Sequence, residues 1–463
     1  MGILSELVSR FRRENVSLEL DDIQALILRS RPEPYVGIHA MLHVDDAAGG
    51  RDLLRRLEPH ISTAAGWAEE LDTWTGVAIS YPGLEALGVP KASLESFPVA
   101  FKAGMAARAH QLRDFGENAP ETWEEEYRDG YCHIALTIYA RDNDALDGAI
   151  ARAFRELKSS TGVTLAGTNR FGADEEAKNP FGFRDSISQP TVAGSGLDTV
   201  PGQERSIAAG EFILGEDSET GSPLLTPAPD VLGRNGSYIV LRKYASKVGA
   251  FNDFLRHHAS TDDEQDLLGA KMFGRWRSGA PLVLSPHMDD VELGADPNRN
   301  NNFDYADDEA GLACPYASHS RRLNPRYGRT TILADENIHR IIRRSSTFGP
   351  KWTRERTAAQ DAEIESGIFF IFISARAFDT IEFLQQEWIN RGNFIDLGDE
   401  RDPIVGLHEN PGTFTIPTEP VRKRVHEVTT FNRLRGGEYM FMPSLSALRW
   451  MAAGEWDGEA QAS

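Results

Sequence analysis

Alternating apolar and β-branched residues predict several strands in the first part of the chain. Three runs lie at 36–44 (VGIHAMLHV), 74–81 (WTGVAISY) and 133–140 (HIALTIYA). Each run is rich in strand-forming residues and is bounded by Pro, Gly or Asp, as strands usually are. A fourth, shorter run at 163–167 predicts one more strand.

Two stretches with helical spacing separate these strands. Residues 46–57 and 144–157 carry apolar residues at intervals that place them on one helical face. The order strand–helix–strand, given twice, is that of a ferredoxin-like, or split βαβ, unit. Residues 81–131 then form a helical insertion within that unit.

A similar order returns more loosely in the second half. We predict strands at 238–242, 367–375 and 439–442, the last of which closes the sheet, and helices at 248–257 and 378–388. The stretch 281–329 is rich in Asp, Asn, Pro and Gly and reads as one long loop system. Loops of that length inside a compact domain are usually functional or disordered.

Composition narrows the class of protein. Of 463 residues, 40% are hydrophobic and 26% are charged, which is typical of a folded globular chain. The net charge of −21 repels phosphate backbones and anionic lipid, so we expect no nucleic-acid partner and no membrane partner. Two cysteines, Cys132 and Cys314, are too few for a disulfide scaffold or a cysteine-built metal site.

No targeting or membrane signal is evident. The N-terminal residues lack an apolar core of signal-peptide length, and the longest apolar run, 367–375 (GIFFIFISA), is too short to span a bilayer. We therefore expect a cytoplasmic protein. Phosphate-loop, zinc-protease and serine-hydrolase motifs are absent, so residue types alone predict an α+β protein whose site is unassigned.

Three segments carry a more specific pattern. They are FGFRDSISQP at 181–190, CPYASHSRRLNPR at 314–326 and IIRRSSTFG at 341–349. In this order they resemble the distal Gly-x-x-Asp-Gly loop, the proximal-histidine segment and the distal-arginine segment of the dye-decolorising peroxidase family of haem enzymes. The resemblance extends over about residues 36–450.

The resemblance implies how a haem would be held. It makes His319 the axial ligand of the haem iron, which in peroxidases is a neutral imidazole. A ligating His usually donates its other N–H to a carboxylate, for which we favour Asp402, with Asp396 as the alternative. Arg326 matches a haem-propionate contact, and its fork of donors suits a carboxylate.

On the other haem face, the resemblance assigns the peroxide chemistry. Asp185 would take a proton from hydrogen peroxide and return one to the leaving oxygen. Arg343 would stabilise the charge on that oxygen and help to keep Asp185 ionised. Ile368 and Phe370 match positions that shape the distal pocket.

The activity implied is reduction of hydrogen peroxide coupled to oxidation of an organic donor, such as a phenol or a dye, through a high-valent haem. The cofactor would be one haem b (iron protoporphyrin IX) per chain. Trp352, Trp388 and Tyr327 are candidates to relay electrons from bulky donors, although packing explains each of them too. Two rivals are a haem-binding protein with another role, such as haem handling or oxygenase activity, and a haem-free cargo or interaction protein.

The fold implied is α+β, with two ferredoxin-like domains in a dimeric α+β barrel-like arrangement and haem in the C-terminal half. We expect an N-terminal domain at 1–234, including the distal Asp loop, and a haem-binding domain at 235–463. Two positions depart from the family pattern. Ser186 replaces the second glycine of the distal motif, and Thr347 stands where proline is more usual. Ser186 would narrow the peroxide path or donate a hydrogen bond to Asp185.

Overall fold

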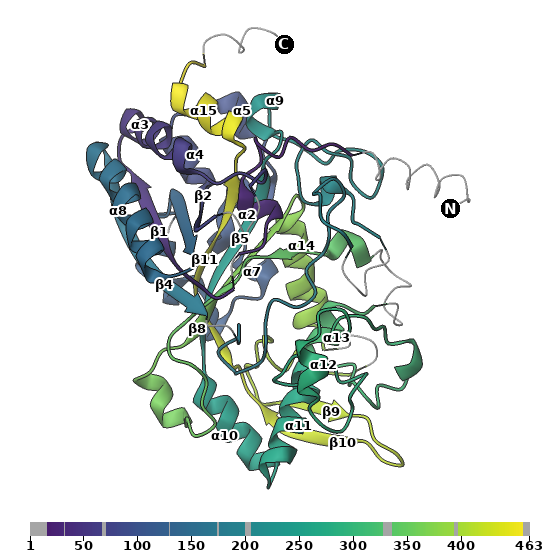
Figure 1. Cartoon of the computed structure of the whole chain (residues 1–463). Coiled ribbons are helices and arrows are strands. Elements are labelled where there is room, and N and C mark those ends of the chain that lie inside the picture. Colours follow the sequence, from purple (N-terminus) through teal and green to yellow (C-terminus); the bar gives the residue numbers. More distant parts are fainter. Residues whose placement is uncertain are drawn as a thin grey trace.

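A computed structural model describes most of the chain. The described residues are 16–31, 33–66, 71–128, 130–173, 176–199, 205–326, 336–392 and 397–456. Within them a nine-stranded sheet organises the fold, in the order β4-β1-β3-β2-β11-β5-β8-β6, with β7 paired to β8 (Figure 1). The strands are β1 Tyr35–Val44, β2 Thr73–Ser80, β3 Ile134–Ala140, β4 Val163–Ala173, β5 Ser237–Ser246, β6 Ile342–Arg343, β7 Ser346–Phe348, β8 Gly367–Ser374 and β11 Asn432–Met442.

The two halves of the sheet repeat one strand order. In the first half, α3 (Ala47–Leu57) follows β1 and α8 (Asn143–Ser159) follows β3, and the order is β4-β1-β3-β2. In the second half, β11-β5-β8 is followed by β6 and β7. Each half therefore sets its strands in the order fourth, first, third, second, and all their pairings are antiparallel.

The predicted strands and helices of both halves are confirmed, with two differences. Residues 439–442 do not close the sheet. They belong to the longer strand β11, which lies at the seam and pairs with β5 on one side and with β2 on the other. The helix predicted at 378–388 is α14 (Ala377–Phe383), which continues as the wider π-turn η10 (Leu384–Ile389).

The ends of the sheet approach each other. Thr347 Oγ1 on β7 donates to the Gly172 carbonyl on β4 at 3.0 Å. The rings of Phe171 and Phe369 lie 6.4 Å apart across the same gap. The sheet is therefore strongly curled, and Thr347 helps to hold its two ends together.

Helices cover the outside of this curled sheet. In Figure 1, α3 and α8 lie together beside β1 and β4, and α15 (Leu445–Ala453) packs against α3. Asp46 and Asp142 cap α3 and α8 by accepting backbone N–H groups. The predicted insertion contains α4 (Tyr81–Ala86), α5 (Lys91–Glu95), α6 (Val99–Ala107) and α7 (Ala109–Leu112). On the second half, α10 (Val248–His258), α11 (Asp262–Phe273), α13 (His319–Leu323) and α14 surround the region where the predicted site residues lie.

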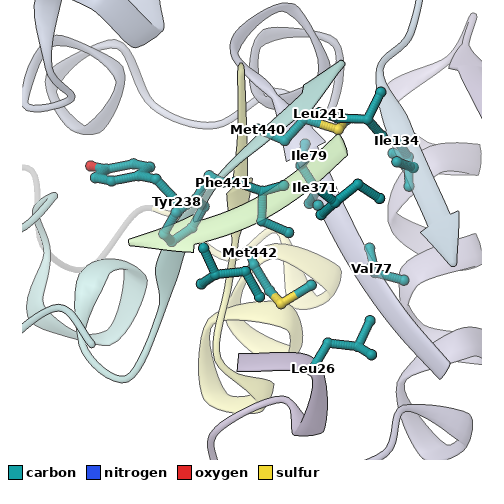
Figure 2. Close-up of a cluster of buried hydrophobic side chains, with 14 of the residues drawn as sticks. Leu26, Val77, Ile79, Ile134, Tyr238, Leu241, Ile371, Met440, Phe441 and Met442 are labelled. Carbon is teal, nitrogen blue, oxygen red and sulfur yellow. The ribbon is translucent and has the colours of Figure 1, made fainter. Parts of the chain in front are cut away.

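Apolar side chains fill the seam between the halves. Ile79 of β2 is paired with Phe441 of β11 across the seam, and Met440 precedes Phe441 on the same strand (Figure 2). Leu26 of α2 (Ala25–Leu28) belongs to the same buried cluster. Both cysteines are free and buried. None of the described helices has the length and apolar character needed to cross a lipid bilayer.

Long-loop residues 281–326 are ordered mainly by polar contacts. The segment contains only short helical turns, among them α12 (Val291–Ala295). Asp308 accepts the N–H groups of Ala313 and Cys314 and pairs with the Arg321 guanidinium at 2.8 Å. Arg321 is also stacked between the rings of two tyrosines. This loop is therefore a structured part of the protein as far as residue 326.

Truncation of Ile79 tests how far the seam stabilises the fold. Because Ile79 is fully buried, we expect Ile79→Ala to lower the free energy of unfolding by about 2–5 kcal/mol, and Ile79→Val by about 0.5–1.5 kcal/mol. Urea denaturation followed by fluorescence measures both. Val421→Ala, at an apolar side chain that is 75% exposed, is the matched control. Equal stability of Ile79→Ala and the control would contradict a packed seam.

Candidate active site

A large cavity lies beside the second half of the sheet. Its volume is about 1740 Å³, counting the space open to solvent. The loop 176–199, the strands β5 and β8, and α13 and η10 all contribute to its wall. The structure brings six of the seven predicted site residues into this wall: Asp185, His319, Arg326, Arg343, Ile368 and Phe370.

His319 is fixed by the seventh residue. His319 is the first residue of α13, and its Nδ1 lies 2.9 Å from Oδ2 of Asp402. Asp402 is fully buried, and its Oδ1 accepts the N–H groups of Ile404 and Val405 at 2.8 and 3.0 Å. The carboxylate orients the imidazole and places the proton on Nδ1, which leaves Nε2 with a lone pair for a metal.

Electrostatics keep Asp402 ionised. Burial alone would raise the pKa of Asp402. The charge and hydrogen bond of His319, the charge of Arg322 and the Val405 amide together outweigh burial, so its pKa lies below the usual value. An ionised Asp402 is the form that accepts the N–H of the His319 imidazole.

A buried arginine connects the backbone around this pair. Arg322, three residues after His319, donates to the carbonyls of Trp388, Glu400 and Arg391 at 2.6, 2.9 and 3.0 Å. These bonds tie α13 to η10 and to the segment that carries Asp402. The His319–Asp402 distance is therefore set by the protein scaffold.

Asp185 and Arg343 meet in the cavity wall. Asp185 Oδ1 accepts its neighbour's amide, Ser186 N–H, at 2.7 Å and lies 3.8 Å from Arg343 Nη1. Arg343, on β6, also donates through Nη2 to the Ile187 carbonyl at 2.5 Å, and its own N–H donates to Gln189 Oε1 at 3.0 Å. Three contacts thus join the arginine strand to the aspartate loop.

Steric contact explains why the first glycine of the distal motif, Gly182, has no side chain. Gly182 has a φ of +82°, and a Cβ there would lie 2.7 Å from the Trp352 ring. The second motif position carries a side chain, Ser186, with a φ of +66°. Its Oγ accepts a hydrogen bond from Arg31 Nη2 at 2.7 Å, and no hydrogen bond links that hydroxyl to the neighbouring Asp185 carboxylate. Ser186 does donate a hydrogen bond to Asp185, but through its backbone N–H, while its hydroxyl accepts from Arg31.

Arg326 lies in the wall and is bonded to the long loop. Its Nη1 donates to the carbonyls of Asn301 and Phe303 at 2.9 and 3.0 Å, and its guanidinium lies over the Phe303 ring at 4.0 Å. Arg275 lines the same cavity. Burial and the positive charges of Arg326 and Arg343 lower the pKa of Arg275. An anionic group in this part of the cavity would relieve that crowding of positive charge.

These features fit an iron porphyrin. The cavity offers an imidazole nitrogen for the iron, the cationic groups just described for the carboxylates, and apolar wall for the macrocycle. The apolar wall includes Phe273, Ile368, Phe370, Leu384 and Ile404. A haem therefore matches the donor set, the charge and the surface of this cavity.

Comparisons with known proteins agree with that fit. The chain is 33% identical to a dye-decolorizing peroxidase of Mycena epipterygia, over 94% of this chain and 88% of that protein. It is 32% identical to the dye-decolorizing peroxidase msp1 of Mycetinis scorodonius, over 81% of this chain and 76% of that protein. This chain belongs to the dye-decolorizing peroxidase family.

Solved structures give the same result. An ancestral D-type dye-decolorizing peroxidase superposes with a TM-score of 0.81 at 28% identity, covering 94% of this chain and 99% of that chain. A peroxidase from Auricularia auricula-judae superposes with a TM-score of 0.79 at 26% identity, covering 94% and 100%. A scan against protein-family models gives no match. The sequence relatives and the solved structures together identify this dye-decolorizing peroxidase as a haem enzyme of that family.

Some residues around the peroxidase cavity were not found from the sequence. Arg275 and Arg31 lie outside the three motif segments, and the tertiary structure brings them to the site. Among the suggested electron-relay residues, Trp388 is buried against the rings of His339 and Phe383, and Trp352 is half-buried. Asp396 and Tyr327 lie outside the described residues.

Replacement of Asp402 tests the histidine partner in this peroxidase. In Asp402→Asn a neutral amide replaces the buried carboxylate, and we expect haem affinity to fall about 10- to 100-fold, as for other outer-shell partners of metal-binding histidines. Titration of the haem-free protein with haemin, followed at the Soret band, measures this. Asp399→Asn, at an exposed carboxylate nearby, is the control. Unchanged haemin affinity in Asp402→Asn would contradict the assignment.

Proposed function

We propose that this peroxidase holds one haem b through His319 and reduces hydrogen peroxide with Asp185 and Arg343, while oxidising phenols and dyes. The observation that carries the proposal is the shared cavity wall, to which the three residues contribute from a loop, a helix and a strand. When bound, haem would supply the redox centre that accepts oxidising equivalents from peroxide and passes them to the donor.

His319 and the cavity arginines would hold the cofactor. Nε2 of His319 is the iron ligand in this proposal, since Nδ1 is bonded to Asp402. Arg326 and Arg275 would face the propionates, because both guanidinium groups line the cavity and lie close enough to repel each other. Ile368 and Phe370 would limit the space above the site without taking part in the chemistry.

Asp185 would move the proton. Its Oδ1 already accepts the Ser186 amide, so we assign proton exchange to Oδ2. An ionised carboxylate takes a proton from one oxygen of hydrogen peroxide and returns it to the other, which then leaves as water. Asp185 ends the exchange in the state in which it began, and the remaining oxygen, with its two oxidising equivalents, would stay with the bound haem.

Arg343 would act on charge and on position. Its Nη1 lies 3.8 Å from Asp185 Oδ1, so it favours the ionised carboxylate. A fixed guanidinium also stabilises negative charge that develops on the departing oxygen. The bond from its Nη2 to the Ile187 carbonyl restrains the guanidinium, and the bond from its backbone N–H to Gln189 holds the strand.

Phenols are the donor class with the most direct support. One solved relative, at 28% identity, is described in complex with 2,6-dimethoxyphenol. The relatives' shared name refers to dyes. A donor of either kind would give up single electrons, and the cytoplasmic location stays a prediction from the sequence.

The repeated strand order supports two ferredoxin-like halves. Each half has the order fourth, first, third, second with helical crossovers, as a split βαβ unit does. We place the boundary near 234–235, just before β5, and describe the curled sheet as barrel-like. The cavity belongs to both units in this proposal, because the loop with Asp185 precedes the boundary and the remaining site residues follow it.

Removal of the iron ligand is the first test. We expect His319→Ala to lose the Soret band, or to show it only with excess haemin, because Nε2 provides the protein's bond to iron. An absorption spectrum of wild type with haemin should shift on one equivalent of peroxide and return on addition of 2,6-dimethoxyphenol. A His319→Ala protein with a normal Soret band that responds to peroxide would sink the ligand assignment.

Separate substitutions of Asp185 and Arg343 test their roles in the reaction with peroxide. We expect Asp185→Asn to slow the reaction with peroxide about 10²- to 10⁴-fold and Arg343→Leu about 10²- to 10³-fold, with haem retained in both. In wild type the rate should fall in strong acid, because a protonated carboxyl group is unable to take a proton from peroxide. Stopped-flow absorbance measures these rates. An unchanged rate in haem-replete Asp185→Asn would remove Asp185 from the mechanism.

A further inference from the structure

The loop that carries Asp185 has a strained backbone. Ser186 and Ser188 both have φ values in the left-handed region, +66° and +68°, where glycine is the residue that fits without cost. Residues with side chains persist in such conformations only when surrounding contacts hold them. The contact that holds Ser186 is therefore important for the position of the neighbouring Asp185.

That contact comes from Arg31, a residue from the far N-terminal part of the chain. Arg31 Nη2 donates to Ser186 Oγ at 2.7 Å. The guanidinium lies over the Tyr35 ring at 4.6 Å, and the residue is only 9% exposed. Glycine at position 186 would have no atom to accept this bond, so the partnership requires the serine that departs from the family motif.

Arg31 is also a second positive charge beside Asp185. Burial lowers the pKa of Arg31, but Tyr35 and the Asp185 carboxylate raise it by more than burial lowers it. The pKa of Arg31 therefore lies above its usual value, and the guanidinium stays charged. Its Nε is buried and has no hydrogen-bond partner among the described residues. Arg343 Nη1 lies 3.8 Å from Asp185 Oδ1, and Arg31 also interacts electrostatically with this carboxylate, so two cations act on Asp185.

The segment around Arg31 also contacts the strand that carries Arg343. Arg344 Nε donates to the Leu26 carbonyl at 2.8 Å, and Tyr139 Oη donates to the Arg344 carbonyl at 2.6 Å. Arg29 Nη1 donates to the Ser195 carbonyl at 2.8 Å, beyond the aspartate loop. One short segment, 25–31, thus bonds to the chain neighbours of both residues of the proposed peroxide site, Ser186 beside Asp185 and Arg344 beside Arg343.

We propose that Arg31 is a positioning residue for the peroxide reaction: its hydrogen bond to Ser186 holds the strained loop so that Asp185 faces Arg343. This proposal rests on the function proposed above. Ser186 and Arg31 together do what the motif glycine does alone, since the glycine adopts the required φ freely and the serine needs a partner to keep it.

The test is a double-mutant cycle on the holoenzyme. Arg31→Ala should slow the peroxide-driven Soret shift about 10-fold or more, while haem content and the rate at which 2,6-dimethoxyphenol restores the spectrum stay unchanged. In a Ser186→Gly background the same Arg31→Ala change should cost less than about 3-fold, because the partner oxygen is already gone. Arg31→Lys should recover part of the rate.

Controls separate the outcomes. Arg141→Ala removes another arginine stacked on an aromatic ring of the first half, Trp74, and should leave the rate unchanged. Equal losses from Arg31→Ala in both backgrounds, or no loss in either, would overturn the proposal. If the Arg31→Ala protein loses haem, the Ser186→Ala variant is measured in its place. Its reaction with peroxide must then also be slower than that of wild type. Normal rates in Asp185→Asn would instead show that the proposed function itself has failed.

Discussion

Buried guanidinium groups that donate to backbone carbonyls hold this peroxidase site together. Irregular segments have no ladder of their own, so their carbonyls need other donors when they are buried. Arg322 satisfies three such carbonyls around Asp402, and Arg326 satisfies two in the long loop. Arg344 does the same for the end of α2. The cavity keeps its shape because its loops are bonded through arginine side chains.

The same principle sets the chemistry of the two sides of the site. His319 is oriented by an acceptor, Asp402, which is itself fixed by two amides. Asp185 is oriented by its neighbour's amide and flanked by cations. One carboxylate is thus kept buried and bonded to an imidazole, while the other lines the cavity, where we propose that it exchanges a proton. Environment, and not residue type, separates the two roles.

The sequence predicts much of the fold, because strand and helix periodicity is a local property. β1, β2 and β3, with α3 and α8, follow directly from alternating and helical patterns. The position of β11 at the seam does not, since pairing with β2 depends on contacts between residues hundreds of positions apart. Three motifs point to His319, Asp185 and Arg343, and the expected acceptor for the histidine leaves Asp402 and Asp396 as candidates, of which the structure pairs Asp402 with His319. Arg31 and Arg275 escape such reasoning because a lone arginine carries no local signal.

The place of β11 has a consequence for biosynthesis. This strand lies in the middle of the sheet yet follows every other strand in the chain. During translation the edges of β2 and β5 therefore stay unpaired until residues 432–442 leave the ribosome. Exposed edges of this kind invite pairing with other chains. Docking of β11 both covers these edges and completes the cofactor cavity, to whose wall it contributes Asn432.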